Sequence, residues 1–133
     1  MSISVKTVIG VFLGGALGSA ARIATSLVLA RFDGTWWPYS VLTVNLIGSF
    51  ALGFLVGNGM HRLPVWLRMG ATTGFLGSFT TLSAISLDVA VPMVRHGAVE
   101  ALVMAPYAIG SMIVGVICAI VGLRLGARSA GGA

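Results

Sequence analysis

Four apolar stretches, each long enough to cross a lipid bilayer, constrain the fold more than any other feature of this sequence. A transmembrane helix needs roughly 20 mostly apolar residues. The stretches cover residues 5–30, 39–59, 66–94 and 98–125. They are continuous, mostly apolar runs and lack the period-2 alternation of β-barrel strands. The sequence therefore predicts an all-α integral membrane protein, with residues 1–133 forming a single domain of four transmembrane helices.

The composition excludes several classes of protein. Charged residues make up 8% of the chain and hydrophobic residues 57%, whereas a soluble domain carries roughly 25% charged residues. Such a chain cannot cover a water-facing surface, so we expect no soluble enzyme. The net charge of +5 comes from scattered basic residues, and without a basic stripe we expect no nucleic-acid partner. The single cysteine, Cys118, excludes an intrachain disulfide.

Basic residues differ in number between the two predicted ends of the helices. The end with both termini and the second connection carries more of them: Lys6, Arg62, Arg68, Arg124 and Arg128. The opposite end carries Arg31 and Arg95, with Arg22 nearby inside the first span. Because basic loops stay in the cytoplasm, this modest difference favours cytoplasmic termini. It also leaves room for insertion in both orientations.

Small residues recur at every fourth position in three of the four spans. The sets are Gly10, Gly14 and Gly18; Ser49, Gly53 and Gly57; and Ser111, Gly115 and Ala119. In lipid, where no hydrophobic effect drives helices together, this spacing lets helix backbones approach closely. We therefore expect a tightly packed bundle.

The third span carries an unusual density of glycine and hydroxyl residues between Thr72 and Ser86. One interpretation is that the helix breaks near its middle and exposes backbone carbonyls, which are ligands for a bound ion. The other is that the hydroxyls hydrogen-bond to carbonyls of their own helix. The sequence leaves both open.

A few polar residues lie inside the spans, and each has a functional and a structural interpretation. Arg22 either attracts an anion or extends to the interface, and Asn45 either lines a pathway or joins two helices. Tyr107 and Ser111 share one helix face, where they line a polar track or satisfy each other. No acid occurs in the first two spans. This set of hydrogen-bond donors suits an anion better than a proton-coupled cation.

Three motifs resemble those of the Fluc/CrcB family of bacterial fluoride channels. Gly14 to Arg22 resembles the GxxxGxxxR of the first helix, and Leu42 to Phe50 the L-x-V-N-x-x-G-S-F of the second. Gly74 to Ser83 resembles the third-helix run G-F-x-G-x-x-T-T-F-S. Chain length, the number of spans and the order of the motifs agree with the family over nearly the whole chain.

The resemblance implies an antiparallel, dual-topology homodimer with fluoride pathways at the subunit interface. It also implies a structural Na⁺ at the dimer centre, bound by the backbone carbonyls of Gly77 and Thr80. The predicted ion-pathway residues are Arg22 at the mouth, the amide of Asn45, the hydroxyls of Thr81 and Ser83, and the polar track of Tyr107 and Ser111.

The sequence also departs from the family pattern. Leu82 and Ile85 occupy positions where the family often has phenylalanine, and Phe75 and Phe79 nearby belong to other motif positions. Val41 replaces an expected threonine, and Gly115 replaces a third hydroxyl of the polar track. These differences leave open how fast fluoride passes and whether the chain pairs with a different homologous subunit.

The sequence as a whole predicts a passive, fluoride-selective channel that spans the bacterial inner (plasma) membrane several times. The alternative is a dual-topology transporter of the small multidrug resistance type, which resembles this chain in size and glycine content. That family needs a glutamate in its first helix, and residues 5–30 contain none. A third hypothesis is a scaffold subunit that transports nothing.

Overall fold

The computed structural model describes residues 3–32 and 38–131, and within these ranges the chain is helical with no β-strand. The segments long and apolar enough to cross a membrane are Val5–Leu29, Tyr39–Gly57, Val65–Arg95 and Leu102–Gly131. They confirm the predicted four-span, all-α architecture. Helix α1 covers the first span and ends in a short 3₁₀ turn, η1 (Ala30–Phe32); α2 covers the second.

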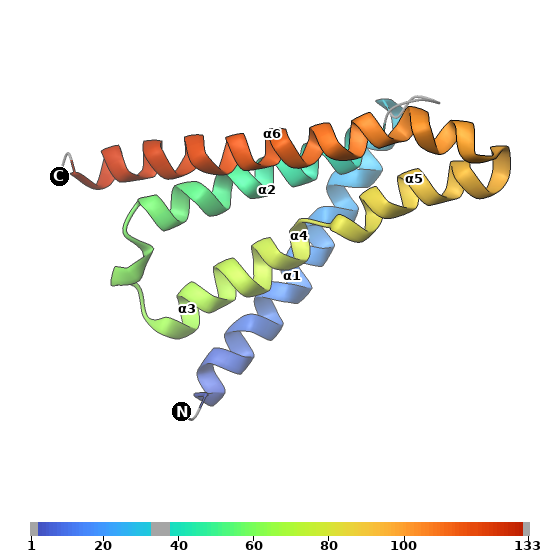
Figure 1. The fold of residues 1–133 in the computed structure, drawn as a ribbon. Helices are drawn as coiled ribbons and strands as arrows, with labels where there is room; N and C mark the ends of the chain where they lie inside the picture. Colours follow the sequence, from blue (N-terminus) through green and yellow to red (C-terminus); the bar gives the residue numbers. More distant parts are fainter. Residues whose placement is uncertain (1–2, 33–37, 132–133) are drawn as a thin grey trace.

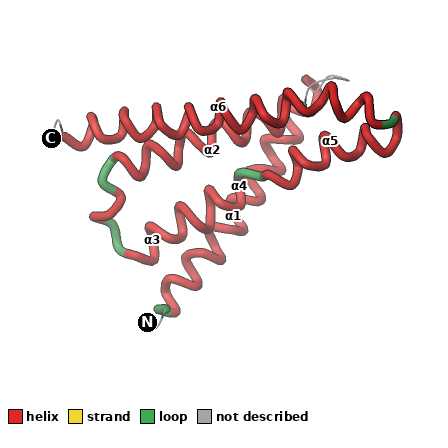
Figure 2. The backbone as a smooth tube through the Cα atoms, viewed as in Figure 1, coloured by secondary structure: helices red, strands yellow, loops and turns green. Residues whose placement is uncertain are grey.

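The third span is a series of short helical segments. A second 3₁₀ turn, η2 (Met60–Arg62), leads into α3 (Val65–Met69), the π-helix η3 (Gly70–Leu76) and α4 (Gly77–Phe79). The backbone then becomes extended at Thr80 (φ −77°, ψ 154°) and Thr81 (φ −149°, ψ 122°) before α5 (Leu82–His96) begins. This interruption, the loop between α4 and α5 in Figure 2, is the break that was one of the two interpretations of the sequence and that the family resemblance implied.

The last helix, α6 (Ala98–Gly131), continues six residues past the predicted end at 125. The prediction took Arg124 and Arg128 as the end of the span, but arginine is a good helix former and a basic residue is favourable near a helix C-terminus. Ser129 Oγ also donates to Asn58 Oδ1 at 3.2 Å, which ties this extension to the end of α2. The apolar part of a helix and the helix itself thus end at different residues.

The helices form two closely packed pairs (Figure 1). Helix α1 runs beside α3, η3 and α4, and α2 runs beside α6. Within each pair the helices are parallel. By contrast, α5 and α6 form an antiparallel hairpin that turns at Gly97, whose φ is +96°. The chain termini and the connection between α2 and α3 lie at one end of the bundle, as the count of basic residues assumed.

Glycine allows both pairs to pack this closely. A Cβ atom on Gly14 would overlap the carbonyl oxygen of Gly70, and one on Gly18 would overlap that of Phe75. In the other pair, a Cβ on Gly53 would overlap the carbonyl oxygen of Ala119. The glycine repeats of the first two spans therefore lie at helix contacts, as predicted.

The glycines of α6 have different surroundings along the helix. Gly122 and Gly126 face the backbone of α2 at Phe50 and Phe54, where a Cβ would overlap the carbonyl oxygens. Gly115, which the sequence analysis assigned to packing, has only Ser49 Oγ within reach of a Cβ, at 3.6 Å. The α2–α6 contact therefore opens toward the middle of the bundle, beside the break.

Candidate functional site

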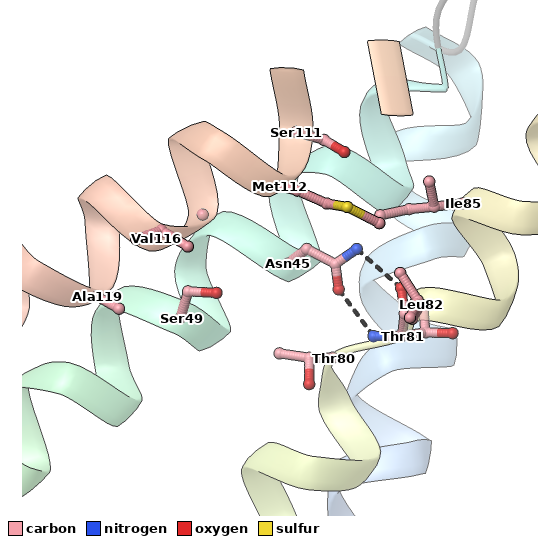
Figure 3. Close-up of a pocket in the computed structure, with 11 residues that line it drawn as sticks. Asn45, Ser49, Thr80, Thr81, Leu82, Ile85, Ser111, Met112, Val116 and Ala119 are labelled. Atoms are coloured by element: carbon pink, nitrogen blue, oxygen red, sulfur yellow. Dashed lines mark hydrogen bonds between the residues drawn. The ribbon is translucent and has the colours of Figure 1, made fainter. Parts of the chain in front are cut away.

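Asn45 holds the break in the third span from a neighbouring helix. Its Oδ1 accepts a hydrogen bond from the backbone N–H of Thr81 at 2.7 Å, and its Nδ2 donates to the Thr81 carbonyl at 2.9 Å. Figure 3 shows both bonds, with the amide of α2 facing the extended backbone. A partly buried amide needs hydrogen-bond partners, and here it replaces the helical partners of both backbone polar groups of one residue, Thr81. Asn45 thereby joins two helices, which was its structural interpretation.

The break also redirects the hydrogen bonds of two backbone carbonyls. In a continuous α-helix the N–H of Thr81 would donate to the carbonyl of Gly77, and the N–H of Ala84 to that of Thr80. The first N–H goes to Asn45 Oδ1 instead, and the second goes to Thr81 Oγ1 at 3.2 Å. The carbonyls of Gly77 and Thr80 therefore lose the donors that a continuous helix would give them.

A groove of about 360 Å³ lies between α2, the break and α6. Its polar lining consists of Asn45, Ser49, Thr80, Thr81 and Ser111. Its apolar lining consists of Leu82, Ile85, Met112, Gly115, Val116 and Ala119. Figure 3 shows Ser49 and Asn45 projecting from α2 and Ser111 from α6. Three of the predicted pathway residues, those at positions 45, 81 and 111, thus come together here.

Arg22 lies in a second cavity, of about 430 Å³, between α1, α2 and the start of α5. Ser26, Ser40 and Thr81 are among the residues that line it. The Arg22 Nε atom is buried and has no hydrogen-bond partner among the described residues. Thr81 lines both cavities, so the cavity of Arg22 and the groove share this residue.

Tyr107 and Ser111, one helical turn apart on α6, are both buried. The single hydrogen of the Tyr107 hydroxyl can be donated to Asp88 Oδ2 at 3.4 Å or to the Pro38 carbonyl at 3.5 Å, and Ser111 Oγ donates to the Ala108 carbonyl at 2.8 Å. They therefore bond to other groups rather than to each other. Tyr107 is only 2% exposed and is not among the residues that line either cavity.

Comparison with known proteins identifies the family. Residues 9–123 match the family model described as CrcB-like protein, Camphor Resistance (CrcB). The chain belongs to the CrcB family. A curated relative from Rhodospirillum centenum, named fluoride-specific ion channel FluC, is 42% identical over 125 residues, which is 90% of this chain and 94% of the relative.

Two further curated relatives carry the same name. The protein from Agrobacterium fabrum is 38% identical over 115 residues, or 85% of this chain and 90% of that relative. The protein from Paracoccus denitrificans is 38% identical over 120 residues, or 90% of this chain and 94% of that relative. The similarity to the CrcB family thus extends over nearly the whole chain, as its three motifs indicated.

The positions that depart from the CrcB pattern differ in their surroundings. Leu82 is 61% exposed and Ile85 is 6% exposed, although both line the groove. Phe75 and Phe79 stack on each other with ring centroids 5.9 Å apart, and neither lines either cavity. Aliphatic side chains therefore occupy the groove where the family pattern has aromatic rings.

Ser49 is a groove residue that the sequence analysis treated only as part of a packing repeat. Its hydroxyl is the nearest atom to the place where a side chain on Gly115 would begin. The hydroxyl of Ser49 on α2 therefore lies close to Gly115 on α6, the position where the polar track lacks its third hydroxyl. Its position one turn after Asn45 was the available signal, because residues four apart share a helix face.

The remaining hydroxyls of the third span divide between the two interpretations that the sequence left open. Thr72, Thr80 and Ser86 donate to the carbonyls of Arg68, Leu76 and Leu82 in their own helices. Thr81 instead caps α5, and its hydroxyl lies 3.0 Å from that of Ser83. Ser83 is exposed and is not among the groove residues.

Proposed function

We propose that this chain is a subunit of a fluoride-selective channel that lets fluoride leave the bacterial cytoplasm passively across the inner membrane. The observation that carries the proposal is the groove beside the break, where Asn45, Thr81 and Ser111 meet at membrane depth without a carboxylate in the lining. The names of the curated relatives support fluoride as the ion. Transport down a gradient, rather than catalysis, is the proposed activity, and it lowers fluoride toxicity.

The chemistry of fluoride explains why such a groove suits it. A small, strongly hydrated anion crosses a membrane only where hydrogen-bond donors replace its water. An amide carries two N–H donors, and Asn45 uses one on the Thr81 carbonyl, so the second is available to an anion. We assign Arg22 to attracting anions. The hydroxyls of Thr81, Ser83, Tyr107 and Ser111 are the proposed further donors along the path.

Several of these hydroxyls must exchange partners to serve an anion. The hydroxyl of Tyr107 has Asp88 and Pro38 as alternative acceptors, and that of Ser111 donates within its own helix. Because a hydroxyl hydrogen rotates freely about the C–O bond, fluoride can take over each bond in turn. This exchange keeps each site weak enough for the ion to leave, which conduction requires.

The proposed assembly is an antiparallel, dual-topology homodimer. In the single chain the groove is open, and long apolar side chains of α6 such as Ile113, Val116 and Ile117 are 52–60% exposed. A second copy would cover part of this surface and close the groove. Small-residue contacts already join the helices within each copy, so the open faces are the ones left for a partner.

The proposed structural ion is Na⁺, bound at the dimer centre by the carbonyls of Gly77 and Thr80. The fit rests on donor chemistry, because both carbonyls have lost their helical hydrogen-bond donors to side chains. Neutral oxygen ligands suit a hard monovalent cation, and two copies would supply two such pairs. The bound ion would supply positive charge to the interface and hold the two breaks together.

Release of fluoride from liposomes that contain the purified protein tests the proposal. A fluoride electrode should record rapid passive release, and a chloride electrode should record little under the same gradient. Proton-coupled cation exchange without fluoride release would instead support a small multidrug resistance type of transporter. Absence of both activities from protein that is folded and inserted would support a scaffold.

A further inference from the structure

We propose that Asn45 and Thr81 are positioning residues for the cation site: their side chains withdraw two backbone N–H groups that would otherwise occupy the Gly77 and Thr80 carbonyls. The inference rests on the proposed Na⁺ site. It assigns to Asn45 and Thr81 a role separate from contact with fluoride. Neither side chain is a cation ligand in this account, because each acts through the backbone.

The first step concerns the Gly77 carbonyl. The N–H four residues later, on Thr81, is the donor that would satisfy it in a helix. Asn45 Oδ1 takes this N–H at 2.7 Å, while the preceding N–H, on Thr80, still reaches the Leu76 carbonyl at 3.0 Å. The series of i→i−4 backbone hydrogen bonds therefore ends with the Thr80 N–H, and the next N–H, on Thr81, bonds to Asn45 of α2 instead.

The second step concerns the Thr80 carbonyl. Its helical donor would be the N–H of Ala84, which instead meets Thr81 Oγ1 at 3.2 Å as the N-cap of α5. Threonine at this position thus begins the next helix and leaves the carbonyl before it without its helical donor. A single residue, Thr81, takes part in both steps, through its N–H in one and its hydroxyl in the other.

The same contacts link the proposed cation site to the groove. Thr80 and Thr81 line the groove together with Asn45, and the bonds that hold Thr81 extended are those that leave the carbonyls exposed. Loss of these bonds should therefore lower the affinity for Na⁺ as well as alter the groove. A residue that only contacted fluoride would leave Na⁺ binding unchanged.

Substitution of Thr81 tests the second step. Thr81→Val removes the hydroxyl but keeps the shape, and a β-branched residue suits the extended backbone there (φ −149°, ψ 122°). Without the hydroxyl, the N–H of Ala84 has no side-chain acceptor and pairs with the Thr80 carbonyl only as the break moves toward a helix, so we expect the affinity for Na⁺ to fall about five-fold, the equivalent of one hydrogen bond. Thr81→Ser keeps the hydroxyl, so its affinity for Na⁺ should equal that of the unaltered protein. Ser86→Ala, in the same helix, is the matched control.

The affinity is measured by Na⁺-dependent thermal stabilisation of the purified protein, with N-methylglucamine chloride at equal ionic strength as the reference. Unchanged Na⁺ affinity in Thr81→Val would overturn the positioning role while leaving the cation site intact. Absence of any Na⁺-dependent stabilisation in the unaltered protein would overturn the cation site and the positioning role together. Fluoride release remains a separate readout of the proposed channel in both cases.

Substitution of Asn45 tests the first step and separates its two roles. Asn45→Asp keeps an oxygen that accepts the Thr81 N–H, so its Na⁺ affinity should be at least that of the unaltered protein. Asn45→Leu keeps the size but offers no acceptor, and its Na⁺ affinity should fall about five-fold or more. Equal Na⁺ affinity in the two variants would contradict the role of the side-chain oxygen. If Asn45→Leu fails to fold, Thr81→Val still decides the inference.

Discussion

The glycine contacts and the polar groove use different means to bring the same helices together. Where α2 meets α6 at Gly53 and Ala119, the backbones touch because no side chain separates them. Less than three turns away, at Asn45, a side chain reaches across to the third span and replaces backbone hydrogen bonds. The first region is tight and purely steric, whereas the second is open and held by a few polar atoms.

The glycine contacts therefore serve the stability of the chain, whereas the polar groove serves the proposed transport. Close glycine packing supplies dispersion contacts without polar groups, which suits a framework in lipid. A groove with donors must stay partly open for an ion to enter, so a few short hydrogen bonds such as those of Asn45 hold it in place of close backbone packing. We expect substitutions in the two regions to fail in different ways.

Gly53→Ala should have the largest effect. The new methyl group would overlap the Ala119 carbonyl, which is backbone and cannot rotate away. Separation of α2 and α6 should lower the free energy of unfolding by about 3 kcal/mol, the upper range for overpacking. The measurement is unfolding in mixed micelles with increasing dodecyl sulfate. Gly110→Ala, where nothing lies within 4 Å, is the control, and an equal loss in both would refute the packing account.

Asn45→Ala should act on the break rather than on the framework. It leaves the N–H and carbonyl of Thr81 without the partners they now have, which should cost about 2 kcal/mol. Amide hydrogen exchange at Thr81 should quicken about 30-fold, the kinetic equivalent of that energy. Asn58→Ala, at the exposed end of α2, serves as the control. Unchanged exchange at Thr81 would show that the break holds without the amide.

Tyr107→Phe should reduce fluoride release about five-fold, the equivalent of about 1 kcal/mol for one donor. The ring remains buried, so the bundle should keep its far-ultraviolet circular dichroism. Tyr39→Phe, at a residue that is 47% exposed, provides the comparison. Release at the unaltered rate would remove the Tyr107 hydroxyl from the pathway.

Thr80→Ala should have the smallest effect. It removes a hydroxyl that donates back to the carbonyl four residues earlier, that of Leu76, at 3.0 Å. The backbone carbonyl proposed as the Na⁺ ligand remains, so the Na⁺ concentration that half-saturates thermal stabilisation should stay within about two-fold, well below the effect of one hydrogen bond. A severe loss of Na⁺ dependence in an intact dimer would mean that the side chain is needed as well.

The sequence predicted the framework better than the site. Four apolar stretches and their glycine repeats depend on local spacing, and the contacts at Gly14 and Gly53 follow from it. The hydroxyls and glycines of the third span made a break one of two open interpretations, and the extended backbone at Thr80 and Thr81 bonds to Asn45, which is distant in sequence. Local propensity carries no information about such a partner.

The same limitation explains the residues that sequence reasoning misjudged. Ser49 was assigned to packing, since only the register of α2 against α6 shows that its hydroxyl lies near Gly115. The bond between Tyr107 and Asp88 joins two helices and leaves no periodic signal. The extension of α6 to Gly131 was missed because hydropathy marks the end of the apolar span rather than the end of the helix.

The central claim is that fluoride passes beside Asn45, and one comparison tests it most directly. Fluoride release from liposomes is measured for Asn45→Asp and for Asn58→Asp, which places the same charge at the exposed end of the same helix. Repulsion between the anion and a carboxylate in the groove should slow release about tenfold or more in the first variant. Release should stay near the unaltered rate in the second. Equal rates in the two variants would contradict a fluoride path at Asn45.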